Sequence, residues 1–238
     1  MPDLDWRAWL DKLGRLWRSS LQVRTVAITV LLSAVAVFVI GGYMSFSVGT
    51  NLFDSRRVDL TATSEKATLA GQRIFSEAAE QVSSEEIEVT MGDAATTILS
   101  AASTNAGTQF AILRSPGQDG PSTPADILTR GLDTDQVISP ELRAAVQGSS
   151  ELRTHSQSVS LTVDGVQQPG LVIGSILEIR GARYELYLVY NIADVAQTLG
   201  FVQQTLVFGG FALVLLIGAV TYIVVRLVVG PVQLAAET

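Results

Sequence analysis

The sequence predicts an α+β protein in which two transmembrane helices flank a segment that contains a small antiparallel sheet. Two long windows, residues 25–53 and 195–225, contain no charged side chain and are 29 and 31 residues long. Between these windows the apolar residues recur first at helical spacing and then in alternation, which is typical of helices followed by strands. Only 16% of the chain is charged while 47% is hydrophobic, so an ordinary soluble domain is excluded.

Composition and missing motifs exclude several functional classes. The formal net charge of −7 argues against a nucleic-acid-binding protein, which needs basic residues to neutralise phosphates. The chain has no cysteine, so it has no disulfide, no thiolate metal site, no cysteine nucleophile and no lipidated cysteine. It also lacks a Gly-Lys-Ser/Thr phosphate loop and a Gly-x-Ser-x-Gly nucleophile elbow. The residues therefore predict no catalytic, cofactor-binding or metal site.

The two uncharged windows predict membrane spans at residues 25–50 and 195–226. A bilayer core of about 30 Å needs about 20 helical residues, and each window exceeds that length. The first window is also longer than the roughly 7–15 apolar residues of a signal peptide, so we expect an uncleaved signal anchor. Gly41, Ser45 and Gly49 lie four residues apart in it and favour close helix packing, within one chain or between two.

Basic residues beside the spans predict the orientation in the membrane. Residues 1–24 contain five basic and three acidic side chains, whereas 54–194 contain 10 basic and 19 acidic ones. Both termini are therefore expected in the cytoplasm and residues 51–194 outside it. Residues 1–24 also alternate Trp and Leu with basic residues, as in an amphipathic helix on the inner membrane face or else a partly ordered tail. The expected membrane-interface anchors are Trp17, Arg18, Arg24 and Arg226.

The outer segment begins with helical patterns. Apolar residues recur every three or four positions over 54–82, and no Gly or Pro separates this stretch from the first span. We therefore expect one long continuous helix. Residues 83–88 are acidic and predict a turn, and 93–102 predict a second helix with Asp93 as its N-cap.

Strand patterns dominate the rest of the outer segment. Residues 109–113, 158–163, 171–179 and 184–192 are expected strands, and Asp164-Gly165 is a favoured hairpin turn. A short helix over 139–146 is expected to begin with Ser139 as cap and Pro140 in its first position. The loop at 115–125 contains three Pro and two Gly, and whether it is a docking site stays open.

A few side chains allow a functional as well as a structural interpretation. His155 is the only histidine and is either an ordinary surface or hydrogen-bonded residue, or a sensor of pH or ligand. Tyr184, Tyr187 and Tyr190 either pack in the core or line a candidate sensor pocket. The acidic side chains around residues 85–93 form either a solvated turn or a weak cation site; they are Glu85, Glu86, Glu88 and Asp93.

The end of the chain resembles the entry into a HAMP linker, in which a proline follows the second span of a sensor. Pro231 follows Arg226 at that distance, and we expect the helix to kink or break there, with residues 227–238 as the beginning of the linker. More specifically, the chain resembles the N-terminal part of actinobacterial MtrB-type sensor histidine kinases. The matching stretches are residues 17–24, 170–174, 184–190 and 226–232, and the likeness is looser over 54–168.

This resemblance implies an extracytoplasmic PAS/Cache-like (PDC-like) sensor domain in a homodimeric two-component kinase. It implies a response regulator as partner, a cell-surface lipoprotein as a candidate partner, and ATP and Mg²⁺ as needs of kinase domains that this chain lacks. The phosphoacceptor motif of the family is absent, so the chain itself is not expected to be an enzyme. Two alternatives stay open: the same input module on a chemoreceptor or cyclase, and a membrane-anchored scaffold that only binds a protein.

Overall fold

The computed structural model describes residues 21–79, 86–103, 107–117, 125–149, 153–163, 165–179 and 181–234. The chain divides into two compact units. We call Met1–Thr50 with Leu199–Thr238 the membrane unit, and Asn51–Thr198 the outer unit. The expected amphipathic helix near the N-terminus, with Trp17 and Arg18, lies outside the described residues.

Two long helices carry the expected membrane spans. Helix α2 (Leu21–Ala79) is 59 residues long and unbroken, which confirms the single continuous helix. Helix α6 (Ala193–Leu234) is 42 residues long. Both contain a stretch long and apolar enough to cross a bilayer, and neither stretch is buried by the protein. Lipid rather than protein can therefore cover these side chains.

A helix break at Pro231 is wrong, because α6 continues through this residue to Leu234, whereas a kink stays a prediction. A proline lacks an N–H and removes one hydrogen bond to the preceding turn. The residues on either side still keep helical backbone geometry. The assignment of residues 227–238 to the beginning of a HAMP linker stays a prediction.

Helix α3 (Glu86–Ala102) starts earlier than expected. The expected turn at 83–88 is wrong from Glu86 onward, and Asp93 lies inside the helix instead of capping it. Acidic residues are favoured in the first turn of a helix, where they face the positive end of its dipole, so the acidic run suits a helix start. The face with Met91, Ala94 and Ile98 is fully buried.

Five antiparallel strands form one sheet with the order β2-β1-β5-β4-β3. The strands are β1 (Gln109–Arg114), β2 (Ile127–Leu128), β3 (His155–Val163), β4 (Val166–Ile179) and β5 (Ala182–Asn191). The four expected strands are confirmed, although β3, β4 and β5 begin earlier than expected, and β2 was not expected. Pro169 of β4 faces Ile192, just beyond the end of β5, so the missing N–H costs no bond within that strand pair.

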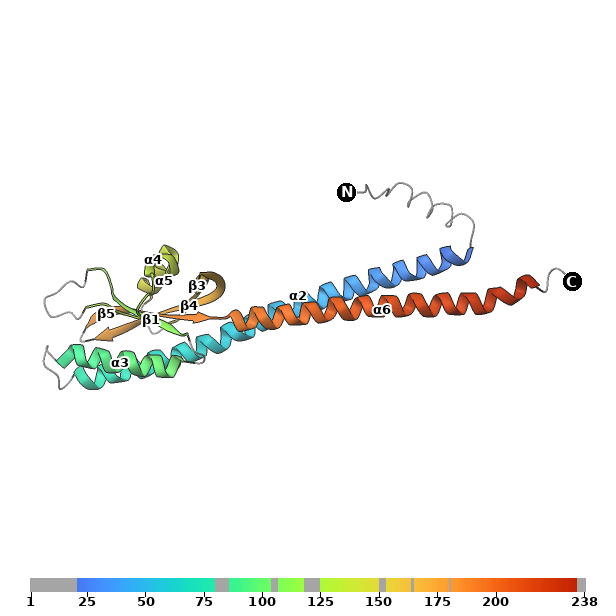
Figure 1. Cartoon of the computed structure of the whole chain (residues 1–238). Helices are drawn as coiled ribbons and strands as arrows, with labels where there is room; N and C mark the ends of the chain where they lie inside the picture. The colour runs from blue at the N-terminus through green and yellow to red at the C-terminus, as the bar shows by residue number, and fades with distance from the viewer. Residues whose placement is uncertain are drawn as a thin grey trace. The chain divides into compact units, whose positions relative to one another are not determined.

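Helices cover both faces of the sheet, with α2 and α3 on one face and α4 (Thr134–Val137) and α5 (Pro140–Gln147) on the other (Figure 1). The start of α5 is as expected, because the Ser139 side chain accepts a hydrogen bond from the backbone N–H of Leu142 at 3.1 Å. Each face has its own apolar core. The α+β class with a small antiparallel sheet is thereby confirmed.

Candidate functional site: a polar seam between helix α2 and the sheet

A row of polar side chains crosses the apolar interface between α2 and the sheet. Ser64, Thr68 and Gln72 lie four residues apart, so they form one stripe along the helix. Ser64 and Thr68 are 1% and 2% exposed. We call these three residues the polar seam. Because buried polar groups are costly without partners, their bonds fix where the helix lies along the sheet.

The two hydroxyls of the seam bond to two different strands. Ser64 Oγ lies 2.8 Å from the hydroxyl oxygen of Tyr190 on β5. Thr68 Oγ1 lies 3.0 Å from Ser175 Oγ on β4 and donates to the Ser64 carbonyl at 2.8 Å. Since a hydroxyl has one proton, Thr68 accepts its bond from Ser175. Helix and sheet are thus joined by directional bonds as well as by apolar packing.

Gln72 completes the seam by pairing with backbone atoms, as a neighbouring strand would. Its Nε2 donates to the Glu178 carbonyl at 2.8 Å, and its Oε1 accepts from the Glu178 N–H at 2.9 Å. This part of β4 lies beyond the residues that pair with β3. The side chain therefore satisfies an open stretch of the sheet edge while it anchors α2.

Arg56 joins the two helices at the end where the chain enters and leaves the outer unit. Its Nη1 lies 3.3 Å from Asp59 on α2, and its Nη2 lies 3.7 Å from Asp194 in the first turn of α6. The Arg56 side chain is 22% exposed, whereas both carboxylates are largely exposed. Such pairs contribute little stability by themselves, but they hold the two helix segments side by side.

The three tyrosines of the candidate sensor pocket do not converge on one point. Side chains alternate along β5, so Tyr184 and Tyr190 pack in the core under α2 and α3, and Tyr187 packs under α4 and α5. All three are at most 2% exposed. The common pocket stays a prediction, and the packing interpretation accounts for their burial.

Burial changes the titration of these tyrosines. It raises the pKa of Tyr184 to about 12, although the positive charge of Arg114 opposes the change. It also raises the pKa of Tyr187, and the negative charge of Glu185 adds to this effect. Burial likewise raises the pKa of Tyr190, partly offset by the hydrogen bond with Ser64. In each case the folded state favours the neutral phenol.

We therefore expect the outer unit to lose stability at alkaline pH. Below the ordinary tyrosine pKa of 10.0 the stabilisation is fully present, and it declines as the pH rises toward about 12, because only the unfolded chain releases these protons readily. The measurement is tyrosinate absorbance and circular dichroism of a Tyr43→Phe, Tyr222→Phe variant in detergent micelles. Ionisation should coincide with unfolding. Complete ionisation of the folded protein near pH 10.0 would contradict the expectation.

A buried carboxylate holds α5 on the opposite face of the sheet. Glu185 on β5 is 0% exposed. Its Oε2 lies 3.0 Å from Arg143 Nε and accepts from the Tyr187 hydroxyl at 3.0 Å, and its Oε1 accepts from Gln147 Nε2 at 2.8 Å. Three donors thus compensate the loss of water around the charge.

His155 is hydrogen-bonded near the end of α5. Its Nε2 lies 2.6 Å from Ser149 Oγ, which donates its proton to the Ala145 carbonyl at 3.1 Å. The histidine nitrogen therefore carries the proton of this bond. The Ser149 carbonyl also accepts from Arg183. This placement agrees with a hydrogen-bonded structural histidine, and a sensing role stays untested.

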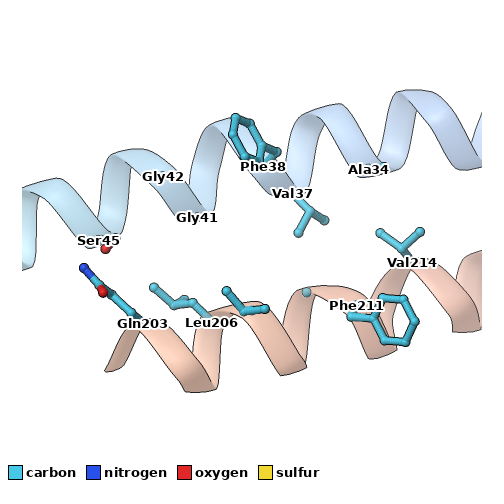
Figure 2. A pocket seen from close by; sticks show the side chains of 12 residues that line it. Ala34, Val37, Phe38, Gly41, Gly42, Ser45, Gln203, Leu206, Phe211 and Val214 are labelled. Carbon is cyan, nitrogen blue, oxygen red and sulfur yellow. The ribbon is translucent and has the colours of Figure 1, made fainter. Parts of the chain in front are cut away.

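The membrane unit has a groove between its two helices, with a volume of about 540 Å³. Gly41 and Ser45 line it from α2, opposite Gln203 and Leu206 of α6 (Figure 2). Gly49 lies outside the groove, where an added Cβ would be 3.4 Å from Leu199. No atom comes within 4 Å of a Cβ added to Gly41, so this glycine leaves the groove open.

Two glycines of α6 that the sequence analysis did not single out lie close to α2. A Cβ added to Gly210 would lie 2.7 Å from Val37 Cγ1, and one added to Gly218 would lie 3.2 Å from Val30 Cγ2. These two glycines lie eight residues apart and so share one face of α6. This spacing in the sequence is the signal that could have predicted the close packing of α6 against α2.

Gly210→Leu is expected to separate α2 from α6 in the membrane unit, because the new side chain overlaps Val37 at a cost of about 1–3 kcal/mol. A Gly49→Cys, Leu199→Cys pair in the cysteine-free chain reports the contact through disulfide yield. The yield should fall in the Gly210→Leu background. It should persist with Gly209→Leu, where nothing lies within 4 Å, and equal loss in both variants would contradict the packing.

The remaining sequence-predicted residues are dispersed. Arg24 and Arg226 are exposed on α2 and α6. Glu86, Glu88 and Asp93 belong to α3, and Glu85 lies outside the described residues. Among the described residues, no three His, Asp or Glu side chains gather as they would around a metal ion. Of the 115–125 loop, residues 118–124 are not described.

Comparisons with known proteins identify similar chains, although no family model matches. The chain is 31% identical over 227 residues to sensor histidine kinase MtrB of Mycolicibacterium paratuberculosis, and 31% identical over 223 residues to that of Mycobacterium tuberculosis. It is 26% identical over 231 residues to that of Mycobacterium leprae. These alignments cover 94%, 93% and 94% of the chain.

The chain spans only 38% to 39% of the length of these curated relatives. The similarity confirms that the chain resembles the N-terminal sensor part of an MtrB-type kinase. Together with the two apolar helices, it indicates a membrane protein.

Proposed function

We propose that the chain is the membrane-bound input module of a two-component sensor histidine kinase. The observation that carries this proposal is the similarity to sensor histidine kinases over 94% of the chain. In this role the outer unit detects an extracytoplasmic ligand or partner protein. The two long helices pass the change through a HAMP segment that begins near Pro231 to kinase domains.

The proposed topology has both termini in the cytoplasm and the outer unit outside. The distribution of charge supports it, because residues 1–24 are net basic whereas 54–194 carry 10 basic and 19 acidic side chains. The proposed sensor fold is PAS/Cache-like (PDC-like). Its support is a five-stranded antiparallel sheet with a long N-terminal helix on one face and short helices on the other.

The polar seam is the proposed point of signal transfer. The outer part of α2 bonds to β4 and β5 through the seam, and β5 is followed almost directly by α6. A change in the sheet would therefore act on both helices. Packed helices respond to such changes by small shifts or rotations rather than by bending continuously.

The proposed partners follow from the same role. A homodimer, the lipid bilayer and a response regulator belong to it, and a cell-surface lipoprotein is a candidate ligand. ATP and Mg²⁺ would serve only the kinase domains. No nucleic acid is expected, because the chain has a net charge of −7.

The topology is tested by labelling single cysteines in intact cells with a maleimide that does not cross membranes. The chain has no cysteine, so each variant has one reactive site. Thr162→Cys in the outer unit should be labelled in intact cells, and Ser19→Cys should be labelled only after lysis. Labelling of Ser19→Cys in intact cells, with Thr162→Cys protected, would contradict the proposal.

A further inference from the structure

The sheet of the outer unit has one long edge that nothing among the described residues covers. Strand β3 is last in the order β2-β1-β5-β4-β3 and is nine residues long. An edge strand presents unpaired N–H and C=O groups that can pair with another extended chain. Natural proteins usually protect such edges with charges, prolines, bulges or covering elements.

Within the part of the chain that the structure describes, the other open edges of this sheet are protected and β3 is not. Strand β2, at the opposite edge, has only two residues. The stretch of β4 beyond β3 is capped by Gln72, which bonds to both the N–H and the C=O of Glu178. Strand β3, with the sequence His-Ser-Gln-Ser-Val-Ser-Leu-Thr-Val, contains no Asp, Glu, Lys, Arg or Pro.

The register shows which backbone groups face outward. The Pro169 carbonyl accepts from Ile192, so the backbone polar groups of Pro169 point away from β3. Its partner Ser160 therefore belongs to a pair without mutual hydrogen bonds, and its N–H and C=O point to the open edge. By the alternation of an antiparallel pair, the same holds along the strand for Ser156, Ser158 and Thr162. All four residues are exposed.

We propose that the open edge of β3 binds an extended segment of a different protein as an added antiparallel strand. Main-chain hydrogen bonds would hold this segment, as in other strand-addition complexes. One face of the segment would place apolar side chains beside Leu161, which belongs to the core under α5, and beside Val159, which packs against that core. Its other face would place polar side chains beside the serines. Since the outer segment carries 19 acidic and 10 basic residues, flanking lysines fit better than acidic residues.

A second copy of this chain is a poorer occupant. Antiparallel pairing of two β3 strands needs a two-fold axis perpendicular to the sheet, which reverses the direction of one copy. The chain enters and leaves the outer unit at one end, as the Arg56–Asp194 pair shows. The two copies would then present these ends in opposite directions. Under the proposed topology both copies are anchored through these ends in one membrane, and a foreign segment avoids this conflict.

The test uses the full chain in detergent micelles and the synthetic peptide Lys-Thr-Val-Thr-Val-Thr-Val-Lys at millimolar concentration. Backbone hydrogen exchange should slow about tenfold at Ser156, Ser158, Ser160 and Thr162, the scale of one hydrogen bond gained. The same peptide, N-methylated at alternate residues on its pairing edge, should have no effect. Equal effects of both peptides, or protection that lies elsewhere, would overturn the proposal.

Two variants distinguish the contribution of the Ser158 N–H to peptide binding from that of the Ser158 side chain. Ser158→Pro removes one outward N–H without removing a bond to β4, and it should weaken peptide binding about tenfold. Ser158→Ala keeps the N–H and should bind as the unchanged chain does. If both variants bind the peptide equally well, the proposal is overturned. If Ser158→Pro does not fold, the comparison with the N-methylated peptide tests the main-chain hydrogen bonds instead.

A control without peptide tests pairing between two copies of the chain. If protection of the same four amides increases with protein concentration, the edge binds a second copy and the proposal is overturned. The exchange experiment does not depend on kinase output or on membrane orientation. It can therefore fail while the proposed input function stands, and the cysteine labelling can fail while strand addition stands.

Discussion

Arg143→Ala is expected to destabilise the outer unit by about 3 kcal/mol, because it leaves Glu185 buried without its cationic partner. Glu185 is 0% exposed in the folded protein, so its charge depends on the donors that surround it. The Arg143 side chain is 42% exposed, which places the effect at the lower end of the range for buried pairs. Urea unfolding followed by circular dichroism measures it.

A second substitution identifies the cause of this loss. Glu185→Gln removes the charge but keeps groups that can bond to Gln147 and Tyr187, so it should recover more than half of the loss in the Arg143→Ala background. The exposed Arg130 is the matched control, and Arg130→Ala should change stability by less than about 0.5 kcal/mol. A similar effect of both arginine variants, or no recovery, would show that Glu185 does not need its partner.

Gly71→Ala is expected to destabilise the outer unit by about 2 kcal/mol, against the usual preference of helices for alanine. An added Cβ would lie 2.4 Å from Ile98 Cδ1 and 2.6 Å from Ile98 Cγ1. Ile98 is fully buried on α3 and cannot move into solvent. Thermal or urea unfolding of the chain in micelles measures the change.

The same substitution at Gly92 should increase the stability of the outer unit instead of lowering it. No atom lies within 4 Å of a Cβ at this position of α3, so Gly92→Ala should stabilise by up to about 1 kcal/mol. Ile98→Val in the Gly71→Ala background should recover part of the loss, because it removes the methyl group nearest to the new Cβ. If Gly71→Ala and Gly92→Ala changed the stability in the same direction, the close packing of α2 on α3 would be refuted.

The sequence predicted well those features that depend on long, uniform patterns. Two windows without charge predicted α2 and α6, because a soluble helix of that length is expected to carry charge on its solvent-facing side. No Gly or Pro separates the first span from the helical pattern that begins at residue 54, which predicted that α2 is continuous. Capping chemistry predicted the start of α5 at Ser139. Each of these features rests on local interactions that one stretch of sequence contains.

Features set by tertiary contacts were missed or misplaced. Strand β2 has two residues and α4 has four, too few for any periodicity to register. Tyr184, Tyr187 and Tyr190 looked like one group, yet strand alternation divides them between the two faces. The polar seam was also missed, because serine, threonine and glutamine at helical spacing look like a solvent-facing stripe until Tyr190 and Ser175 are seen to bond with them.

The central claim is that the outer unit controls a kinase through the polar seam. Its most direct measurement uses a chimera in which this chain replaces the matching part of sensor histidine kinase MtrB of Mycobacterium tuberculosis, which the chain matches over 223 residues. Autophosphorylation by ATP is measured in membrane vesicles. Thr68→Val removes the hydroxyl that bonds to Ser175, and Thr61→Val removes a hydroxyl that bonds to Arg57 O of its own helix.

We expect Thr68→Val to change the autophosphorylation level about fivefold, since one hydrogen bond of about 1 kcal/mol shifts a two-state equilibrium by that factor. Thr61→Val should leave the level unchanged. Both chimeras must be inserted in the membrane at equal amounts. Equal autophosphorylation by the Thr68→Val, Thr61→Val and unsubstituted chimeras would contradict signal transfer through the seam.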